Sequence, residues 1–345
     1  MPNCFLYPIS ALFFYPRRLF FVLLCLPVLF LTSQKEAHAA EAWNASVSPL
    51  SQYPVYFFSV DKARQEIALV VKEKETLAPV AFVGTTGSAG GDKLREGDLK
   101  TPEGVYFVVK HIPSGLDYFK YGNEAFTLNY PNPVDRLRKK TGHGIWIHGR
   151  GEPLIPMQTE GCVSMLNDEL ETLRPLLIPG ATVLMAQTVS FPTEKNSPDA
   201  GIAQLLQAKV EAWGTAWSGK SADFFDYYDA ASYGIAQRQP FAKFKAQKEK
   251  VFKKAGKITI TITDIRALPG PGYWVTWFNQ TYEAPGVSEK GTRRLYWSPD
   301  ATGDYKIIGM EWVSNLDSTL RPVQQKPSAG RSWQQVAPGK ALDGR

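Results

Sequence analysis

Residues 146–149 read Trp-Ile-His-Gly, and residues 159–163 read Thr-Glu-Gly-Cys-Val. The first stretch ends an apolar run, which predicts a strand that stops at the histidine. In the second, the glycine beside the cysteine lets a substrate carbonyl approach the backbone. A cysteine becomes an acylating nucleophile when a base takes its proton and nearby donors stabilise the oxyanion. The two stretches therefore predict Cys162 as a nucleophile and His148 as its general base.

A metal site is a poor alternative for these residues. His143 lies five residues before His148, and an odd separation on a regular strand places two side chains on opposite faces. The sequence also contains no H-E-x-x-H and no C-x-x-C pattern. We predict neither a metal nor an organic cofactor, and we place His143 at the rim of the cleft among the substrate-binding residues.

The N-terminus has the pattern of an export signal. Arg17 and Arg18 precede the apolar run Leu19–Thr32, and a polar stretch then ends in Ala-His-Ala at residues 37–39. This order is typical of a secretory signal peptide, residues 1–39, and predicts a periplasmic or cell-envelope location. An uncleaved membrane anchor stays open as the alternative. Cleavage removes two of the three cysteines and leaves Cys162 as a single thiol, which is inert, intermolecularly linked or reactive.

Composition and charge limit the remaining classes. Of 345 residues, 44% are hydrophobic and 21% are charged, which excludes a chain that is disordered throughout. The length favours about two domains. The formal net charge of +6 suits an anionic partner, but no dense stripe of Lys and Arg indicates nucleic acid. The oligomeric state stays open.

Short β-branched and aromatic runs predict a β-rich domain with mixed sheets and few helices over residues 53–187. Three successive antiparallel strands are predicted first, and a loop rich in glycine follows at residues 84–97. A helix is predicted at residues 167–177, capped by Asn167 or Asp168. The predicted strands cover residues 55–60, 66–72, 79–84, 104–110, 125–130, 144–148 and 182–187.

The pattern changes after a linker predicted at residues 188–200, which contains Pro192, Asn196, Ser197 and Pro198 and is followed by Gly201. Apolar residues at helical spacing follow, and then alternating strands. These predict an α+β domain over residues 201–320, and the tail 321–345 has the composition of a disordered segment. The helices are expected at residues 202–218, 221–230 and 239–254, and the strands at 257–267, 273–283, 292–298 and 305–313.

The histidine and cysteine stretches together resemble the signature of the L,D-transpeptidase catalytic domain, also called the YkuD family. That signature is a His-Gly, a spacer, and then Ser or Thr, any residue, Gly and Cys. Residues 91–106 resemble a second family segment, in which a Gly-Asp stretch and Thr-Pro-Glu-Gly lead into a strand. The resemblance covers about residues 53–187.

The resemblance implies a role for each matching residue. Cys162 would be the nucleophile and His148 the general base, with Gly149 orienting the histidine through its carbonyl. Thr159 matches the hydroxyl position three residues before the cysteine. The backbone amides of Gly161 and Cys162 would donate to the oxyanion, a contribution of about 10²–10³ in rate per donor.

One position departs from the common family pattern. Many members carry Arg or Asn two residues after the cysteine, where this chain has Ser164. The missing cation would have held a substrate carboxylate. We therefore add Ser164, Arg150 and Arg138 to the substrate-binding candidates, with ordinary surface charges as the alternative for the two arginines.

The second domain resembles the nuclear transport factor 2-like fold, a cone-shaped α+β unit with a curved antiparallel sheet. A catalytic domain of this type followed by such a domain resembles the cell-shape L,D-carboxypeptidases of helical Gram-negative bacteria. The implied substrate is the peptidoglycan stem tetrapeptide, cleaved between meso-diaminopimelate and the terminal D-Ala.

The step after acylation stays open in the sequence. Water would complete an L,D-carboxypeptidase reaction, which the domain order and Ser164 favour. A second stem would instead give a 3–3 crosslink, and a protein lysine would give an attached protein. A cysteine peptidase for ordinary L-peptides is a weaker alternative. The alternative from another class of protein is a non-catalytic cell-wall binding module. The intact pair of Cys162 and His148 disfavours it.

Overall fold

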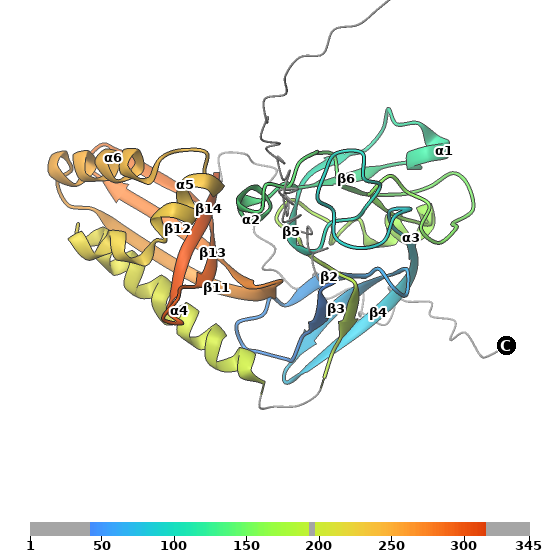
Figure 1. Ribbon diagram of the computed structural model, residues 1–345, viewed down its shortest axis with the longest axis horizontal. Helices are drawn as coiled ribbons and strands as arrows, with labels where there is room; N and C mark the ends of the chain where they lie inside the picture. The colour runs from blue at the N-terminus through green and yellow to red at the C-terminus, as the bar shows by residue number, and fades with distance from the viewer. Residues whose placement is uncertain (1–41, 193–196, 315–345) are drawn as a thin grey trace, which may run out of the picture. The chain divides into compact units, whose positions relative to one another are not determined.

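The computed structural model describes residues 42–192 and 197–314 (Figure 1). The predicted signal peptide and the predicted tail lie outside the described residues. The described residues belong to one compact unit. No helix in the described part of the chain is long and apolar enough to cross a membrane.

The first half of the described chain is a closed barrel of mixed strands, which confirms the predicted β-rich fold with few helices. The strands β2, β3 and β4 are consecutive and antiparallel, as predicted, whereas β7 and β8 pair in parallel. Around the barrel the order is β2 (Tyr56–Asp61), β3 (Glu66–Glu73), β4 (Thr76–Thr85), β8 (Val163–Met165), β7 (Trp146–His148), β6 (Ala125–Leu128), β5 (Gly104–Ile112) and β9 (Thr182–Ala186).

Side-chain alternation along β7 and β8 separates the barrel core from the opposite face of these strands. Ile147, Val163 and Met165 are at most 1% exposed and belong to one hydrophobic cluster of the barrel. Successive side chains of a strand point to opposite faces. His148 and Cys162 therefore lie on the other face, away from this cluster.

Three short helices connect the strands: α1 (Tyr118–Tyr121), α2 (Pro133–Leu137) and α3 (Asn167–Leu173). The predicted cap of α3 is wrong. Its N-cap is Leu166, which makes no side-chain cap hydrogen bond, and the helix ends four residues before the predicted position 177. The Asn167 side chain is used elsewhere, because it accepts from the Asn123 amide and donates to the Arg150 carbonyl.

One strand of a parallel pair lies where the sequence predicts a linker. β1 (Asn44–Ser46) pairs with β10 (Thr188–Ser190), and α4 (Pro198–Ser218) begins at residue 198. The ordered structure therefore extends into both ends of the predicted linker. Strands of three residues carry too little periodicity to be recognised in the sequence.

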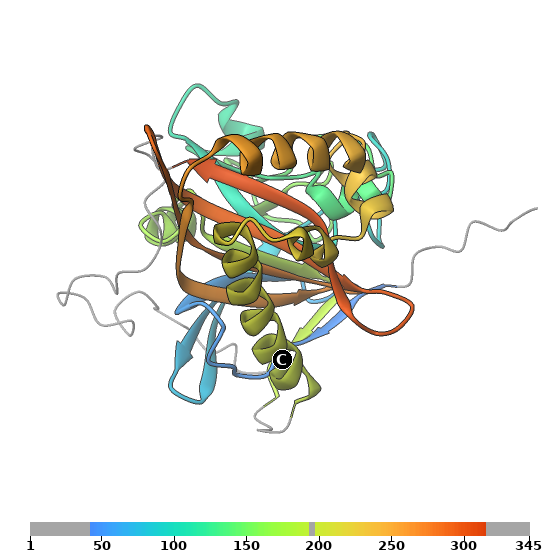
Figure 2. The ribbon, with the colours of Figure 1, turned by 90° about the vertical axis from the view of Figure 1, so that its left-hand side faces the viewer.

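The second half is the predicted α+β domain, in which helices cover one face of a four-stranded antiparallel sheet (Figure 2). Large aromatic side chains fill its interior, among them Trp213, Phe224 and Trp297, all fully buried. After α4 come the 3-10 helix η1 (Ala222–Tyr227), α5 (Ala230–Ala236), α6 (Phe241–Lys254), β11 (Thr259–Gly270), β12 (Tyr273–Ala284), β13 (Val287–Pro299) and β14 (Tyr305–Ser314).

The turn between β11 and β12 contacts the barrel near the start of β5. The Tyr273 hydroxyl accepts a hydrogen bond from the Val105 amide at 2.9 Å. The Arg138 guanidinium, just after α2, donates to the Pro271 carbonyl. Residues of both halves also share one hydrophobic cluster.

Candidate active site

Neighbouring strands bring the predicted nucleophile and base to one face of the barrel. β7 ends at His148, and Cys162 directly precedes β8, which pairs with β7 in parallel so that His148 stands beside Ser164. The alternation of the two strands places the imidazole and the thiol on the same face. If the two groups lay on opposite faces of the sheet, they could not react together. In this pair of described strands they do not lie on opposite faces.

The imidazole of His148 is held in one orientation and kept neutral. Its Nδ1 lies 2.6 Å from the Gly149 carbonyl oxygen, which only accepts, so Nδ1 carries the hydrogen and Nε2 the lone pair. The Tyr121 ring packs edge-on against it, with 5.1 Å between ring centroids. Burial lowers the pKa of His148 to about 4, against the opposing hydrogen bond to Gly149. Near pH 7 the ring is therefore a neutral proton acceptor.

Ser164 lies behind the histidine. Its side chain is fully buried, and its hydroxyl donates to the Gly149 carbonyl at 3.2 Å. A substrate contact of Ser164 stays a prediction, and in this structure its hydroxyl is engaged by the Gly149 carbonyl instead. Two donors, His148 and Ser164, converge on one carbonyl, and a Cβ at Gly149 would overlap the Asn167 Oδ1. The sequence departure at position 164 thus contributes to orienting the base.

The thiol of Cys162 is also neutral in the free protein. Its Sγ donates to the Gly144 carbonyl at 3.4 Å. Burial raises the pKa of the thiol to about 11, and a hydrogen bond from the Trp146 backbone opposes this only in part. The sequence leads one to expect an imidazole that increases the thiolate fraction. Here desolvation of both groups is the larger effect, so the proton must move when the sulfur attacks.

The loop before the cysteine is fixed by the Thr159 hydroxyl. It donates to the Cys162 carbonyl at 2.6 Å and accepts from the Gly161 amide at 3.1 Å. The Gly161 amide is therefore occupied, and its predicted role as an oxyanion donor is wrong for this conformation. Gly161 has φ +121°, and a Cβ there would lie 2.7 Å from the Lys100 carbonyl oxygen, so only glycine fits.

Thr101 holds the same loop from the other side and was missed as a site residue. Its hydroxyl donates to the Gly161 carbonyl at 3.0 Å and accepts from the Gly87 amide at 2.9 Å. Thr101 begins the Thr-Pro-Glu-Gly stretch that carries the second family resemblance. That stretch was the available signal, but the sequence gives no hint that its hydroxyl reaches the cysteine loop.

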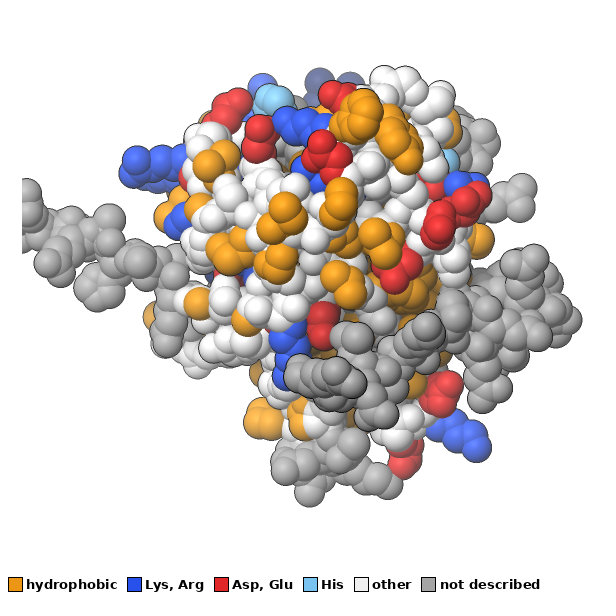
Figure 3. All heavy atoms as spheres, turned by 90° about the vertical axis from the view of Figure 1, so that its right-hand side faces the viewer, with side chains coloured by type: hydrophobic (Ala, Val, Ile, Leu, Met, Phe, Trp, Pro, Cys, Tyr) orange, Lys and Arg blue, Asp and Glu red, His pale blue; other side chains and the backbone are white. Residues whose placement is uncertain are grey.

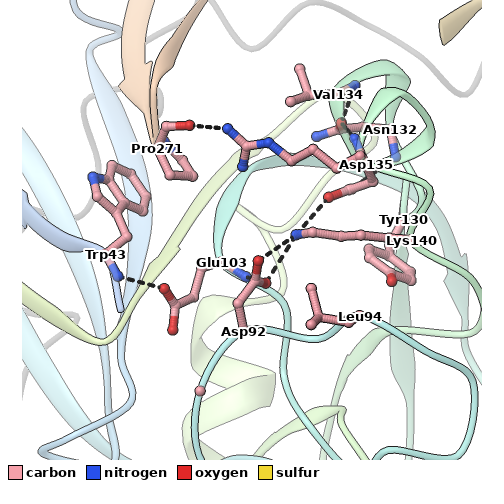
Figure 4. Close-up of polar contacts among 12 residues, drawn as sticks. Trp43, Asp92, Leu94, Glu103, Tyr130, Asn132, Val134, Asp135, Lys140 and Pro271 are labelled. Atoms are coloured by element: carbon pink, nitrogen blue, oxygen red, sulfur yellow. Dashed lines mark hydrogen bonds and ion pairs between the residues drawn. The ribbon is translucent and has the colours of Figure 1, made fainter. Parts of the chain in front are cut away.

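A buried polar network supports both segments that touch the cysteine (Figure 4). The Lys140 ammonium, whose side chain is fully buried, pairs with Asp92 at 2.7 Å and with Asp135 at 3.0 Å. Asp92 in turn accepts from the Glu103 amide at 2.8 Å. Thr101 lies within residues 92–103, and Gly144, which accepts from the thiol, follows Lys140 in the chain. The contact of Lys140 with Asp92 therefore connects the two segments that hold the thiol.

The remaining predicted substrate-binding residues lie in three different surroundings. Arg150 is close enough to His148 for its charge to lower the histidine pKa. It pairs with Glu152 at 3.3 Å, and its buried Nε has no partner among the described residues. Arg138 contacts the Pro271 carbonyl and the Tyr273 ring, and its role beside the substrate stays a prediction. The His143 side chain is 84% exposed, 3.9 Å from a Glu96 oxygen.

No metal cluster accompanies these residues in the part of the chain that the structure describes. Within residues 42–192 and 197–314, no three His, Cys, Asp or Glu side chains are grouped to hold an ion.

Two family models match the chain, in the order that the sequence leads one to expect. Residues 56–185 match YkuD, the L,D-transpeptidase catalytic domain, and residues 205–311 match the Cds6 C-terminal NTF2-like domain. The barrel is therefore an L,D-transpeptidase catalytic domain, and the α+β unit that follows it is an NTF2-like domain.

Known relatives resemble one or both domains. The putative L,D-transpeptidase YafK of Escherichia coli (strain K12) is 28% identical over 123 residues, which are 35% of this chain and 46% of YafK, so the match spans less than half of that relative. The structure of Bdellovibrio bacteriovorus Bd1075 is 25% identical, with a TM-score of 0.60, over 78% of this chain and 95% of Bd1075. The helical cell shape determining protein Pgp2 of Campylobacter jejuni is 28% identical, with a TM-score of 0.60, over 74% and 91%.

Proposed function

We propose that this chain, an L,D-transpeptidase catalytic domain followed by an NTF2-like domain, is an exported cysteine enzyme that trims peptidoglycan stem peptides. Its substrate is the stem tetrapeptide, and its reaction is that of an L,D-carboxypeptidase. The observation that supports the proposal is the placement of Cys162 and His148 on one face of adjacent parallel strands, with the histidine Nδ1 fixed by Gly149.

In the first step the Cys162 sulfur bonds to the carbonyl carbon of the L-centre of meso-diaminopimelate. His148 Nε2 takes the thiol proton during the attack, because both groups are neutral beforehand. The bond to D-Ala then breaks, and His148 passes the proton to the leaving amine. The products are free D-Ala and a thioester on Cys162. The Cys162 amide keeps its proposed role as an oxyanion donor.

In the second step a water molecule attacks the thioester and gives a proton to His148. The carbon–sulfur bond breaks, the tripeptide leaves with a new carboxyl group that releases its proton to solvent, and the proton on His148 returns to the sulfur. The domain order favours hydrolysis, because it resembles that of the cell-shape L,D-carboxypeptidases, and the match to the cell shape determining protein Pgp2 extends over both domains. The amine of a second stem would give a 3–3 crosslink in place of the tripeptide.

The test is to incubate the purified protein with a disaccharide tetrapeptide and analyse the products by mass spectrometry. We expect a disaccharide tripeptide and free D-Ala, and no product with Cys162→Ala. His148→Ala should slow the reaction by about 10²–10⁴-fold, the usual contribution of a general base. A crosslinked dimer without tripeptide would replace hydrolysis by transpeptidation. If the wild-type protein shows neither turnover nor a thioester, the proposed reaction is wrong and the cell-wall binding module is the remaining interpretation.

Export to the periplasm or cell envelope is part of the proposal and rests on residues 1–39 alone. Fractionation of cells that express the full chain would test it, with N-terminal sequencing of the exported form. A mature N-terminus at Ala40 is expected. Recovery of the full-length chain with the membrane would favour an uncleaved anchor instead.

A further inference from the structure

Helix α1 places one ion pair beside the reacting groups. Lys120 Nζ lies 3.0 Å from Glu160 Oε2, and Glu160 is two residues before Cys162. The next residue of α1, Tyr121, packs its ring 5.1 Å from the His148 ring and 5.3 Å from that of Trp146. The ion pair therefore connects the loop that precedes Cys162 with helix α1, which packs against the histidine.

The two charges of the pair act on the sulfur in opposite directions. The positive charge of Lys120 lowers the pKa of Cys162 and that of His148, and the negative charge of Glu160 raises the pKa of Cys162. Both side chains are open to a ligand, with exposed fractions of 45% for Lys120 and 70% for Glu160. A substrate held at the sulfur thus meets one cation and one anion together.

We propose that Lys120 and Glu160 form a recognition pair for a zwitterionic amino-acid head of the substrate. Lys120 receives the carboxylate of that head, and Glu160 receives its ammonium group. This rests on the proposed function, in which the head is the D-centre of meso-diaminopimelate. That centre is the free end of the side chain whose L-centre carbonyl is attacked by Cys162.

Charge complementarity favours a zwitterion over a simple ion. An exposed Lys–Glu pair contributes little to folding stability, so a ligand that replaces each partner can open it easily. A head with only an ammonium group would satisfy Glu160 and leave Lys120 without its carboxylate. On the face that Figure 3 shows, acidic and basic side chains lie near one another in the upper part and neither sign prevails, which suits a neutral head better than a polyanion.

The test measures binding of two tetrapeptide stems by calorimetry in the Cys162→Ala background, so that it does not depend on turnover. One stem carries meso-diaminopimelate, and the other carries L-lysine, which has the ammonium group without the carboxylate. We expect the diaminopimelate stem to bind more tightly, by roughly fivefold, the scale of one exposed charged contact. Lys120→Met should abolish this preference by weakening only the diaminopimelate stem. Glu160→Gln should weaken both stems.

A matched control is Glu171→Gln, since Glu171 also forms an exposed pair, with Arg174 at 3.2 Å and a similar exposed fraction of 62%. It should change neither affinity. Equal weakening of both stems by Lys120→Met would overturn the proposal, because that pattern means contact with the D-Ala carboxylate. No effect of either variant would also overturn it. Selective binding without turnover by wild-type protein would keep the recognition pair and reject the proposed reaction.

Discussion

One buried lysine of the barrel and two cations of the NTF2-like domain are stabilised in different ways. In the barrel, Lys140 is fully buried and contacts two carboxylates, Asp92 and Asp135. In the NTF2-like domain, Lys248 lies 3.8 Å from the centre of the Trp217 ring, and Arg293 lies 4.6 Å from that of Trp312. Among the described residues neither of these two cations forms an ion pair with a carboxylate.

The difference between these cations shows what their contacts do in each region. The paired lysine of the barrel fixes loops that hold the Cys162 thiol, and burial keeps that thiol neutral. In the second domain, burial together with the nearby charge of Arg293, opposed by Glu289, lowers the pKa of Lys248 to about 7. An aromatic ring attracts a cation less strongly than a carboxylate does. The two lysines should therefore respond very differently to the same substitution.

The largest expected effect is that of Lys140→Met on stability. Removal of the lysine leaves Asp92 and Asp135 buried without their cation, which typically costs about 3–5 kcal/mol. Urea unfolding at pH 7 measures this loss. If the variant does not fold, Lys140→Met with Asp135→Asn should recover part of the stability. A loss below about 1 kcal/mol would show that the network does not hold the loops.

A second prediction concerns the neutral thiol of the barrel. Because the pKa of Cys162 is about 11 in place of the usual 9.0, its thiolate fraction at pH 7 should be about a hundredfold below that of a free cysteine. Alkylation by iodoacetamide should accordingly be slow at pH 7 and accelerate up to about pH 11. A rate that is already constant between pH 5 and pH 7 would instead indicate a preformed thiolate–imidazolium pair.

Much of this fold can be predicted from periodicity, because its long strands are half-buried or have distinct turns. β12 and β14, for example, lie within one residue of the predicted ends. β8 was missed because its three residues, Val163–Met165, are all buried and so show no alternation. The short strands β1 and β10 were missed for another reason, since three residues carry too little periodicity and the two strands depend on pairing between residues far apart in the chain.

The site residues also divide into those that a sequence pattern predicts and those that only the folded chain brings together. Cys162 and His148 are predictable because the chemistry of a nucleophile and a base limits the residue types to very few. Ser164, Thr101 and Lys140 are not, since each acts on a backbone atom or carboxylate that only the folded chain brings close. Arg138 was assigned to the substrate from its charge alone, and its contact with Pro271 depends on the second domain.

A third prediction compares two glycines with left-handed backbone angles, one in each region. Gly161→Ala combines φ +121° with a contact of 2.7 Å to the Lys100 carbonyl oxygen, and should cost about 2 kcal/mol. Gly303, with φ +85° and no atom within 4 Å of an added Cβ, is the matched control. Gly303→Ala should cost less and leave tripeptide formation unchanged, whereas Gly161→Ala should also lower kcat. Equal losses of stability would mean that the contact with Lys100 relaxes freely.

The smallest expected effect is the pH dependence contributed by Lys248. Its pKa in the folded chain, about 7, lies below the ordinary 10.5, so between these values the unfolded chain binds more protons. Stability should therefore rise as the pH increases above 7, by about 1 kcal/mol between pH 7 and pH 8, and this contribution should be absent below pH 7. Lys248→Met removes the titrating group and should abolish the difference, which urea unfolding at both pH values measures. If the variant keeps the full rise in stability, another group causes the pH dependence. If the variant loses much stability at pH 7, the Trp217 ring stabilises its cation as well as the carboxylates stabilise Lys140.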